Sequence, residues 1–163
     1  MISAMTLHRE VLGEIVETFQ TLDPACGIVL IGSVARGNER PQSDLDLNLF
    51  FSGSGTLPQH AYIGEDNRWQ LKIKDELRGI RIDVAWETYD GLEERLQGDS
   101  PRDCWSFSRS EILYDPSGKL ASCQALAQQW FQEHPAVTEQ FEREYAAAKQ
   151  IQARQHAAQN SGA

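Results

Sequence analysis

The segment from Asp44 to Phe51 is the part of the sequence that most restricts the fold. Three leucines alternate there with two aspartates and an asparagine: Leu45, Leu47 and Leu49 against Asp44, Asp46 and Asn48. Side chains two residues apart on a β-strand point to the same face, so the segment is predicted to be a strand with one apolar and one polar face. The apolar face needs a covering layer, and the two aspartates project together from the opposite face.

Periodicity elsewhere predicts helices and strands around this strand. Four apolar residues recur every four positions and predict a helix over 6–22: Leu7, Val11, Ile15 and Phe19. A short β-branched run predicts a buried strand over 27–31, followed by a glycine-rich turn over 32–37. The remaining predicted elements are an antiparallel pair of strands over 69–74 and 79–86, a helix capped by Asp90 and ending near Gly98, a strand over 109–114, a helix that Asp115-Pro116 begins and that ends near Glu133, and a helix from Pro135.

Composition and charge exclude several classes of protein. The chain is 40% hydrophobic and 24% charged, as in ordinary globular domains, and its formal net charge is −9. A protein that holds a long nucleic acid normally carries a basic stripe, so no such partner is expected. No stretch is long and apolar enough for a membrane span and residues 1–10 lack the order of a secretory signal, so a cytoplasmic location is expected. The three cysteines, Cys26, Cys104 and Cys123, have no spacing typical of disulfide frameworks or zinc sites.

Three aspartates are candidates for metal binding. Two adjacent carboxylates repel each other unless a cation lies between them, and Mg²⁺ takes carboxylate oxygens together with substrate phosphate oxygens. Asp44 and Asp46 form such a pair. Asp83 lies on the face of its strand opposite to Ile80, Ile82, Val84 and Trp86, and it lacks a nearby partner in the sequence. If that strand lies beside the strand of Asp44, Asp83 completes a cluster of three carboxylates.

The turn after the first predicted strand is a candidate phosphate site. A strand-to-helix turn presents backbone N–H groups where a phosphate is favoured. Gly32 would let a triphosphate approach closely, and the Ser33 hydroxyl would donate to a phosphate oxygen. Arg36 either neutralises phosphate charge or is structural, and Lys72 and Lys74 are weaker candidates for phosphate contact. A P-loop is excluded, because Asn38 and Glu39 follow Gly37 where that motif needs Lys and then Ser or Thr.

Each feature also has a purely structural interpretation. Alone, Gly32-Ser33 could be only a tight turn, and the two aspartates a solvated strand edge. The four histidines, His8, His60, His134 and His156, lack ligand spacing and are predicted to lie at the surface. The four tryptophans, Trp69, Trp86, Trp105 and Trp130, are predicted to lie in the core or an interface. Trp105 and Phe107, expected in a loop after the catalytic strands, are the best candidates for an exception, because such a loop could overhang a pocket.

Taken in order, these motifs match a known pattern. Gly32-Ser33 after a strand, then Arg36-Gly37, then Asp44-x-Asp46 at the start of the next strand resemble the signature of the polymerase β-type nucleotidyltransferase superfamily. The resemblance covers roughly 26–86. It implies an α/β (α+β) fold, with a small mixed, largely antiparallel sheet backed by helices and with C-terminal helices. The expected organisation is a catalytic domain over 1–116, a helical extension over 117–158 and a disordered tail over 159–163.

The resemblance also implies roles for the site residues. Asp44, Asp46 and Asp83 would be catalytic and hold two Mg²⁺ ions, with Asp83 on the second metal or taking the proton of the acceptor. The nucleotide would contact five further residues: Gly32, Ser33, Arg36, Ser43 and Lys72. The implied reaction is attack by an acceptor hydroxyl on the α-phosphorus of an NTP, with ATP expected, and release of pyrophosphate.

The resemblance does not determine the acceptor, because two groups of the superfamily are similar in size and signature. One is the aminoglycoside nucleotidyltransferases, and the other is the minimal nucleotidyltransferase antitoxins that modify a partner protein. An acidic surface suits a cationic small molecule or a basic partner protein equally well. A non-catalytic nucleotide-binding module is a third interpretation. About forty residues follow the segment 113–116, which is short for an acceptor domain, so a second subunit, in a homodimer or from a partner protein, is expected to contribute.

Overall fold

A five-stranded sheet forms the centre of the computed structural model, which describes residues 4–37, 40–41, 43–51, 62–63, 69–70, 75–97 and 101–160. Its strands are β1 (Gly27–Ile31), β2 (Leu45–Phe51), β5 (Asp75–Leu77), β6 (Ile80–Thr88) and β7 (Glu111–Tyr114), in the spatial order β5-β6-β2-β1-β7. The β1–β2, β1–β7 and β5–β6 pairs are antiparallel, and the β2–β6 pair is parallel. The predicted mixed, largely antiparallel sheet is thereby confirmed.

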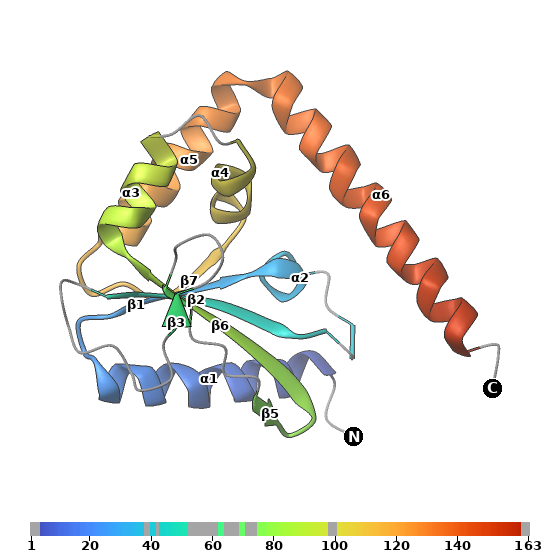
Figure 1. Cartoon of the computed structure of the whole chain (residues 1–163), viewed down its shortest axis with the longest axis horizontal. Helices are drawn as coiled ribbons and strands as arrows, with labels where there is room; N and C mark the ends of the chain where they lie inside the picture. Colours follow the sequence, from blue (N-terminus) through green and yellow to red (C-terminus); the bar gives the residue numbers. More distant parts are fainter. Residues whose placement is uncertain are drawn as a thin grey trace.

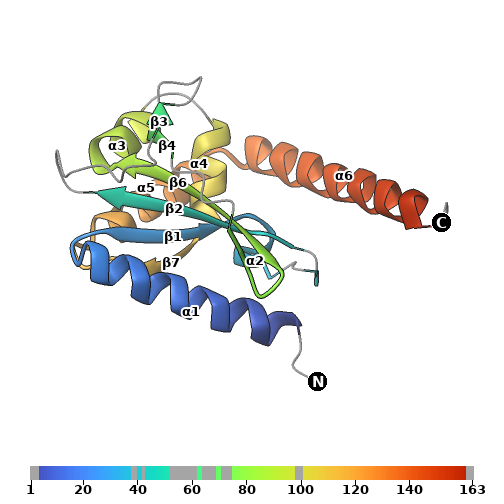
Figure 2. The same cartoon turned by 60° about the horizontal axis from the view of Figure 1, so that its bottom comes forward.

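Helices cover both faces of this sheet (Figure 1). Helix α1 (Ala4–Leu22) lies on one face, and α3 (Tyr89–Gln97), α4 (Pro101–Ser108) and α5 (Lys119–Glu133) lie on the other. The short α2 (Gly32–Ala35) follows β1 directly. Helix α6 (Pro135–Asn160) leaves the second helical layer and extends away from the sheet (Figure 2).

Two apolar cores explain this layering. The core under α1 is formed by the leucine face of β2 and by alternate residues of β1 and β6, and its members include Val11, Ile15, Phe19, Ile28, Leu30, Leu45, Leu47, Leu49, Ile80, Ile82, Val84 and Trp86. The opposite core is contributed mainly by the helices and includes Val29, Phe50, Tyr89, Leu92, Trp105, Phe107, Leu120 and Phe131. Because strand side chains alternate between the faces, the first core leaves Asp46 and Asp83 on the side of the second helical layer.

The hairpin before β6 differs from the prediction. The strand that pairs with β6 is β5, in the register Leu77↔Ile80, whereas β4 (Trp69–Gln70) pairs with β3 (Tyr62–Ile63) in a separate two-stranded sheet. Arg78 and Gly79 both have positive φ, 53° and 79°. This two-residue turn is of the kind that closes a tight hairpin, and it fixes the partner of β6 as the three residues immediately before it.

Helix α4 is a second difference from the prediction. Trp105 and Phe107 were expected in a loop, as exceptions to core packing, but they lie in α4 and are each 4% exposed. Both belong to the core of the second helical layer, so the general expectation of core packing holds for Trp105. Pro101 stands at the first position of this helix, where proline is favoured. The two aromatic residues therefore have a packing role.

Several smaller predictions are also corrected. Thr88 Oγ1 accepts the N–H of Gly91, so Thr88 caps α3 in place of Asp90. Gly118 has a φ of +71° and delays the start of α5 to Lys119. Helix α6 continues to Asn160, two residues into the expected tail, and residues 161–163 lie outside the described residues. The three cysteines are buried, as small core residues are.

Candidate active site

Two aspartates lie side by side on the polar face of the sheet. Strands β2 and β6 are parallel, with Asp46 opposite Asp83 in register. Neighbouring strands are about 4.8 Å apart and residues in register share a face, so the two carboxylates project from adjacent positions. Asp44 directly precedes β2, two residues before Asp46. The fold thus brings together the three aspartates that the sequence singled out.

Arg81 is the counter-ion of this group, and the sequence analysis missed it. Its guanidinium donates to Asp44 Oδ2, and its Nε lies 3.7 Å from Asp83 Oδ2. Arg81 stands two residues before Asp83 on the same strand, hence on the same face. The expectation that Asp83 lacks a nearby partner in the sequence was wrong, and the two-residue spacing was the signal that could have revealed it. The Arg81 side chain is 57% exposed, so these ion pairs are weak.

Asp46 is the aspartate of this group whose ionised form is most disfavoured by its surroundings. Its pKa is raised from 3.8 to about 6, first by burial and then by the negative charges of Asp83 and Asp44. Arg81 and Arg36 act in the opposite direction. Such a carboxyl sits in a strongly negative environment that a bound cation would relieve.

Gly32 places the backbone of α2 against Asp46. Its φ is +79°, and a Cβ at this position would lie 2.6 Å from Asp46 Oδ2. The register explains the proximity, because Ile31 at the end of β1 pairs with Asp46. Glycine is required here both by the backbone conformation and by the close approach. Ser33 follows and is half-buried.

Ser43 belongs to the turn that delivers Asp44. Its Oγ accepts the N–H of Arg40 at 2.8 Å, and its carbonyl oxygen pairs with Nε2 of His8 at 2.9 Å. His8 is 1% exposed, so the prediction that the four histidines lie at the surface was wrong for His8. A buried polar ring needs a hydrogen-bond partner, and the backbone of Ser43 supplies it. The contact ties α1 to the start of β2.

The other predicted residues are more dispersed. The Arg36 guanidinium carbon lies 5.0 Å from the centroid of the Tyr145 ring, a cation–π contact between α6 and the residue that follows α2. Tyr145 was not predicted as a neighbour of the site. Lys72 lies outside the described residues. In the described part of the chain, no three His, Cys, Asp or Glu side chains converge closely enough to hold a metal ion.

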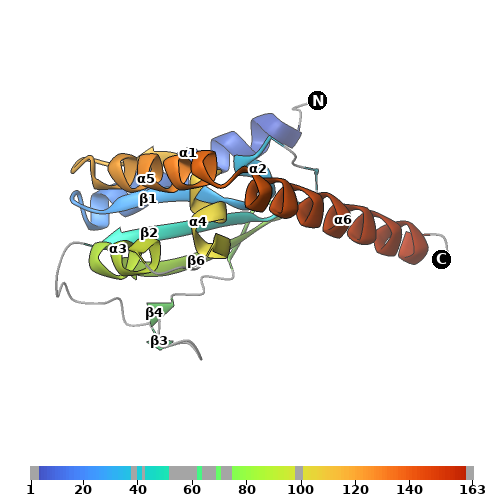
Figure 3. The same cartoon turned by 90° about the horizontal axis from the view of Figure 1, so that it is seen from above.

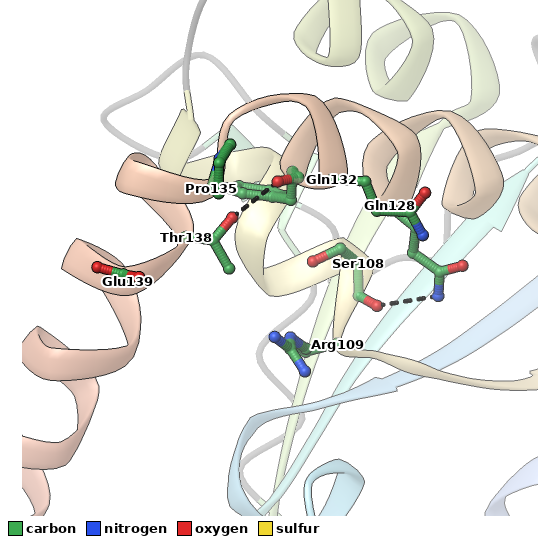
Figure 4. Close-up of a pocket in the computed structure, with 8 residues that line it drawn as sticks. Ser108, Arg109, Gln128, Gln132, Pro135, Thr138 and Glu139 are labelled. Carbon is green, nitrogen blue, oxygen red and sulfur yellow. Dashed lines mark hydrogen bonds between the residues drawn. The ribbon is translucent and has the colours of Figure 1, made fainter.

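Two cavities occur elsewhere in the molecule. The larger, of about 440 Å³, lies between α4, α5 and the start of α6 and is lined by residues that include Arg109, Gln128 and Thr138 (Figure 4). The smaller, of about 250 Å³, lies between α3 and α5. None of the three aspartates lines either of these two cavities.

The sequence match decides the family. Residues 12–112, well over half of the chain, match the family of nucleotidyltransferase domains. The chain belongs to this family. The matched range contains the Gly32 turn and all three aspartates, and the protein is therefore a transferase of nucleoside monophosphate groups.

Other comparisons with the nucleotidyltransferase are more distant. No curated protein sequence matches it. A crystal structure of a toxin–antitoxin with AMP-PNP is similar at 17% identity and a TM-score of 0.45, over 81% of this chain and 95% of that one. A mutant of the toxin–antitoxin MntA-HpeT is similar at 15% identity and a TM-score of 0.43, with the same coverage. The family assignment rests on the sequence match. Among the described residues, no helix has the length and apolar character to cross a membrane.

Proposed function

We propose that this nucleotidyltransferase transfers AMP from ATP to an acceptor hydroxyl, with Mg²⁺ ions bound by Asp44, Asp46 and Asp83. The observation that carries the proposal is the in-register pair Asp46↔Asp83, beside Asp44 and against the Gly32 turn. Carboxylates on one face of a sheet, next to a turn that admits close approach, suit a nucleotide carried as its metal complex.

The side chains fit a divalent cation by their chemistry. All three offer oxygen ligands, which Mg²⁺ prefers. Arg81 now balances part of their charge through weak, exposed ion pairs, and the raised pKa of Asp46 reflects the charge that remains. When bound, the metal ions neutralise phosphate charge and stabilise the attacking and leaving oxygens.

The chain's own residues then position the reactants. Gly32 leaves room for the triphosphate, the Ser33 hydroxyl donates to a phosphate oxygen, and Arg36 offsets negative charge. The Asp83 carboxylate takes the proton of the acceptor hydroxyl as its oxygen bonds to the α-phosphorus and the bond to pyrophosphate breaks. Ser43 would act near the nucleotide through the turn it closes, and Lys72 stays a candidate for phosphate contact.

The acceptor is a small cationic molecule or a protein, and the formal net charge of −9 suits either an aminoglycoside-like compound or a basic partner. A partner, either a second copy or another protein, would complete the acceptor side. Incubation of the chain with α-³²P-labelled ATP and each acceptor class separates these possibilities. Label on a small molecule and label on a protein identify different acceptors. ATP binding without transfer to any acceptor would favour a non-catalytic nucleotide-binding module.

The metal assignment is tested by calorimetric titration of ATP, CTP, GTP and UTP with and without Mg²⁺. We expect metal-dependent binding in the wild type and its loss in Asp44→Asn/Asp46→Asn. Asp90→Asn, which removes an exposed carboxylate in the first turn of α3, is the matched control and should bind normally. Metal-dependent binding that survives in the double variant would refute the assignment.

A further inference from the structure

His8 is a buried polar side chain on the apolar face of α1. It is 1% exposed, and Val11 and Leu12, one helical turn further on, belong to the core under this helix. Its Nε2 lies 2.9 Å from the carbonyl oxygen of Ser43. A carbonyl oxygen can only accept, so Nε2 carries the hydrogen and donates it. An apolar side chain would fill the same space without the cost of burying a polar ring, so the hydrogen bond itself is what a histidine adds here.

The contact joins α1 to the turn that precedes β2. In this turn, the Ser43 N–H donates to the Arg40 carbonyl oxygen at 2.9 Å, and the Arg40 N–H donates to Ser43 Oγ at 2.8 Å. Figure 3 shows the N-terminal end of α1 at the same end of the sheet as α2. A turn that is closed by its own hydrogen bonds is thus also held from outside, by His8.

Asp44 depends on this turn more than the other two aspartates do. Asp46 is paired on both sides, with Ile31 of β1 and with Asp83 of β6. Asp44 precedes β2, and the pairing of β2 with β6 begins at Leu45 in the described residues. The sheet therefore fixes the backbone of two of the three aspartates, whereas the backbone of Asp44 is fixed by what holds the turn.

The direction of the Asp44 side chain follows from the peptide group before it. The Ser43 carbonyl oxygen and the Asp44 nitrogen belong to one planar peptide group. A hydrogen bond that holds the oxygen therefore fixes this plane, and with it the direction of the Cα–Cβ bond of Asp44. In the orientation found here, Arg81 contacts the carboxylates of both Asp44 and Asp83. The two carboxylates thus already face one common cationic group.

We propose that His8 is a positioning residue for Asp44: it holds the Ser43–Asp44 peptide so that the Asp44 carboxylate meets the same cation as Asp46 and Asp83. That His8 orders this peptide is a property of the fold alone. The benefit to cation binding rests on the proposed function. His8 acts through the backbone of Ser43 and does not itself contact the substrate or the cation.

Two substitutions separate the hydrogen bond of His8 from the volume of its side chain. His8→Leu fills the space and removes the donor, whereas His8→Gln keeps an N–H that can donate to the Ser43 carbonyl oxygen. Electron paramagnetic resonance of free Mn²⁺ measures the affinity of the full chain for this ion. We expect about fivefold weaker Mn²⁺ binding in His8→Leu and nearly wild-type binding in His8→Gln. Val11→Ala is the matched control, because it removes buried volume from the same face of α1 and should lower the thermal stability without changing the Mn²⁺ affinity.

A second measurement does not depend on the metal. Nuclear magnetic resonance relaxation of the ¹⁵N-labelled, metal-free chain gives the order parameter of each backbone N–H. We expect a lower order parameter for the Asp44 N–H in His8→Leu, its recovery in His8→Gln, and no change for the Asp46 N–H, which the sheet holds. If His8→Leu fails to fold, His8→Met replaces it, because methionine has a flexible side chain that fills the space without a donor.

Three results would overturn the proposal: equal Mn²⁺ affinities or equal Asp44 order parameters in the wild type and His8→Leu, failure of His8→Gln to restore them, or an equal loss of affinity in Val11→Ala. The proposed function fails separately, if Mn²⁺ binding survives in Asp44→Asn/Asp46→Asn or if the wild type binds no Mn²⁺. In either of those cases, the order parameters of the Asp44 N–H decide whether His8 holds the peptide.

Discussion

Asp46 is a residue whose surroundings oppose its own charge. Burial and two neighbouring carboxylates raise its pKa to about 6, whereas an unfolded chain ionises near 3.8. The unfolded state therefore loses its proton first as the pH rises. The contribution of Asp46 to the free energy of unfolding therefore falls between about pH 4 and pH 6. Above pH 6, the ionised Asp46 lowers the free energy of unfolding by on the order of 2–3 kcal/mol. The group required for cation binding is thus destabilising without the cation.

We predict that Asp46→Asn stabilises the metal-free protein at pH 8 by on the order of 2 kcal/mol and has little effect at pH 4. The amide keeps the size of the side chain and removes the charge that burial disfavours. Urea unfolding in EDTA at the two pH values measures both effects, with Asp90→Asn as the exposed control. An equal change at pH 4 and pH 8 would show that charge is not the cause. The same variant should lose metal-dependent ATP binding.

Arg81 has the complementary role. It pairs with two carboxylates that would otherwise be free to bind a cation, so we predict that Arg81→Gln binds Mn²⁺ about fivefold more tightly. Electron paramagnetic resonance of free Mn²⁺ gives this affinity directly, without a nucleotide or an activity assay. Arg78→Gln is the control, because Arg78 pairs with Glu10 and Glu14 away from the three aspartates. Unchanged Mn²⁺ affinity in Arg81→Gln would mean that the arginine does not compete with the metal.

Among the structural elements, the short α2 depends for its position against Asp46 on its first residue, Gly32. Gly32 and Gly37 both have positive φ, +79° and +64°, but a Cβ at Gly37 would meet nothing within 4 Å. Alanine at either position strains the backbone by about 1 kcal/mol, and only at Gly32 does it also collide with Asp46 Oδ2. We predict that Gly32→Ala lowers the free energy of unfolding by roughly a further 1–2 kcal/mol and weakens ATP binding. Gly37→Ala should leave ATP binding unchanged. Chemical unfolding measures the stability of the two variants, and calorimetry measures their ATP affinity. Equal losses of stability in Gly32→Ala and Gly37→Ala would contradict the steric argument.

Elements with a strong local pattern were predictable from the sequence. The alternation of Leu45, Leu47 and Leu49 with Asp44 and Asp46 determines both strand and face, and the positive φ of Gly32 agrees with the turn expected there. Features that depend on distant partners were not predictable. The pairing of β6 depends on the Arg78-Gly79 turn, and the burial of Trp105 depends on α5 and α6. His8 and Ser43 are 35 residues apart, and no local pattern relates them.

For the whole molecule, Trp105 holds the second helical layer and α6 together. Its ring contacts Phe131 of α5 as well as Phe141 and Tyr145 of α6, and the Arg109 guanidinium lies over it at 4.6 Å. We predict that Trp105→Ala lowers the free energy of unfolding by about 3–5 kcal/mol. Because α6 loses its main apolar contact, its amides should exchange faster than those of the sheet.

Urea unfolding and hydrogen exchange with mass spectrometry measure the two effects of this substitution. Trp130→Ala serves as the control, because Trp130 is only partly buried and stacks on His134 at the end of α5. We expect a smaller loss of stability and unchanged exchange in the second half of α6. Normal protection of α6 in Trp105→Ala would show that other contacts hold the helix.

The contact of Tyr145 with both Trp105 and Arg36 gives the protein a built-in optical reporter. Indole emission responds to the rings and charges around the indole. Here the Tyr145 ring lies between the Trp105 indole and the Arg36 guanidinium, which is proposed to contact the substrate. A ligand that draws Arg36 from Tyr145 would change the emission of Trp105, and Trp105→Phe would identify the source of the signal. Substrates and candidate acceptors can then be screened on the unlabelled enzyme.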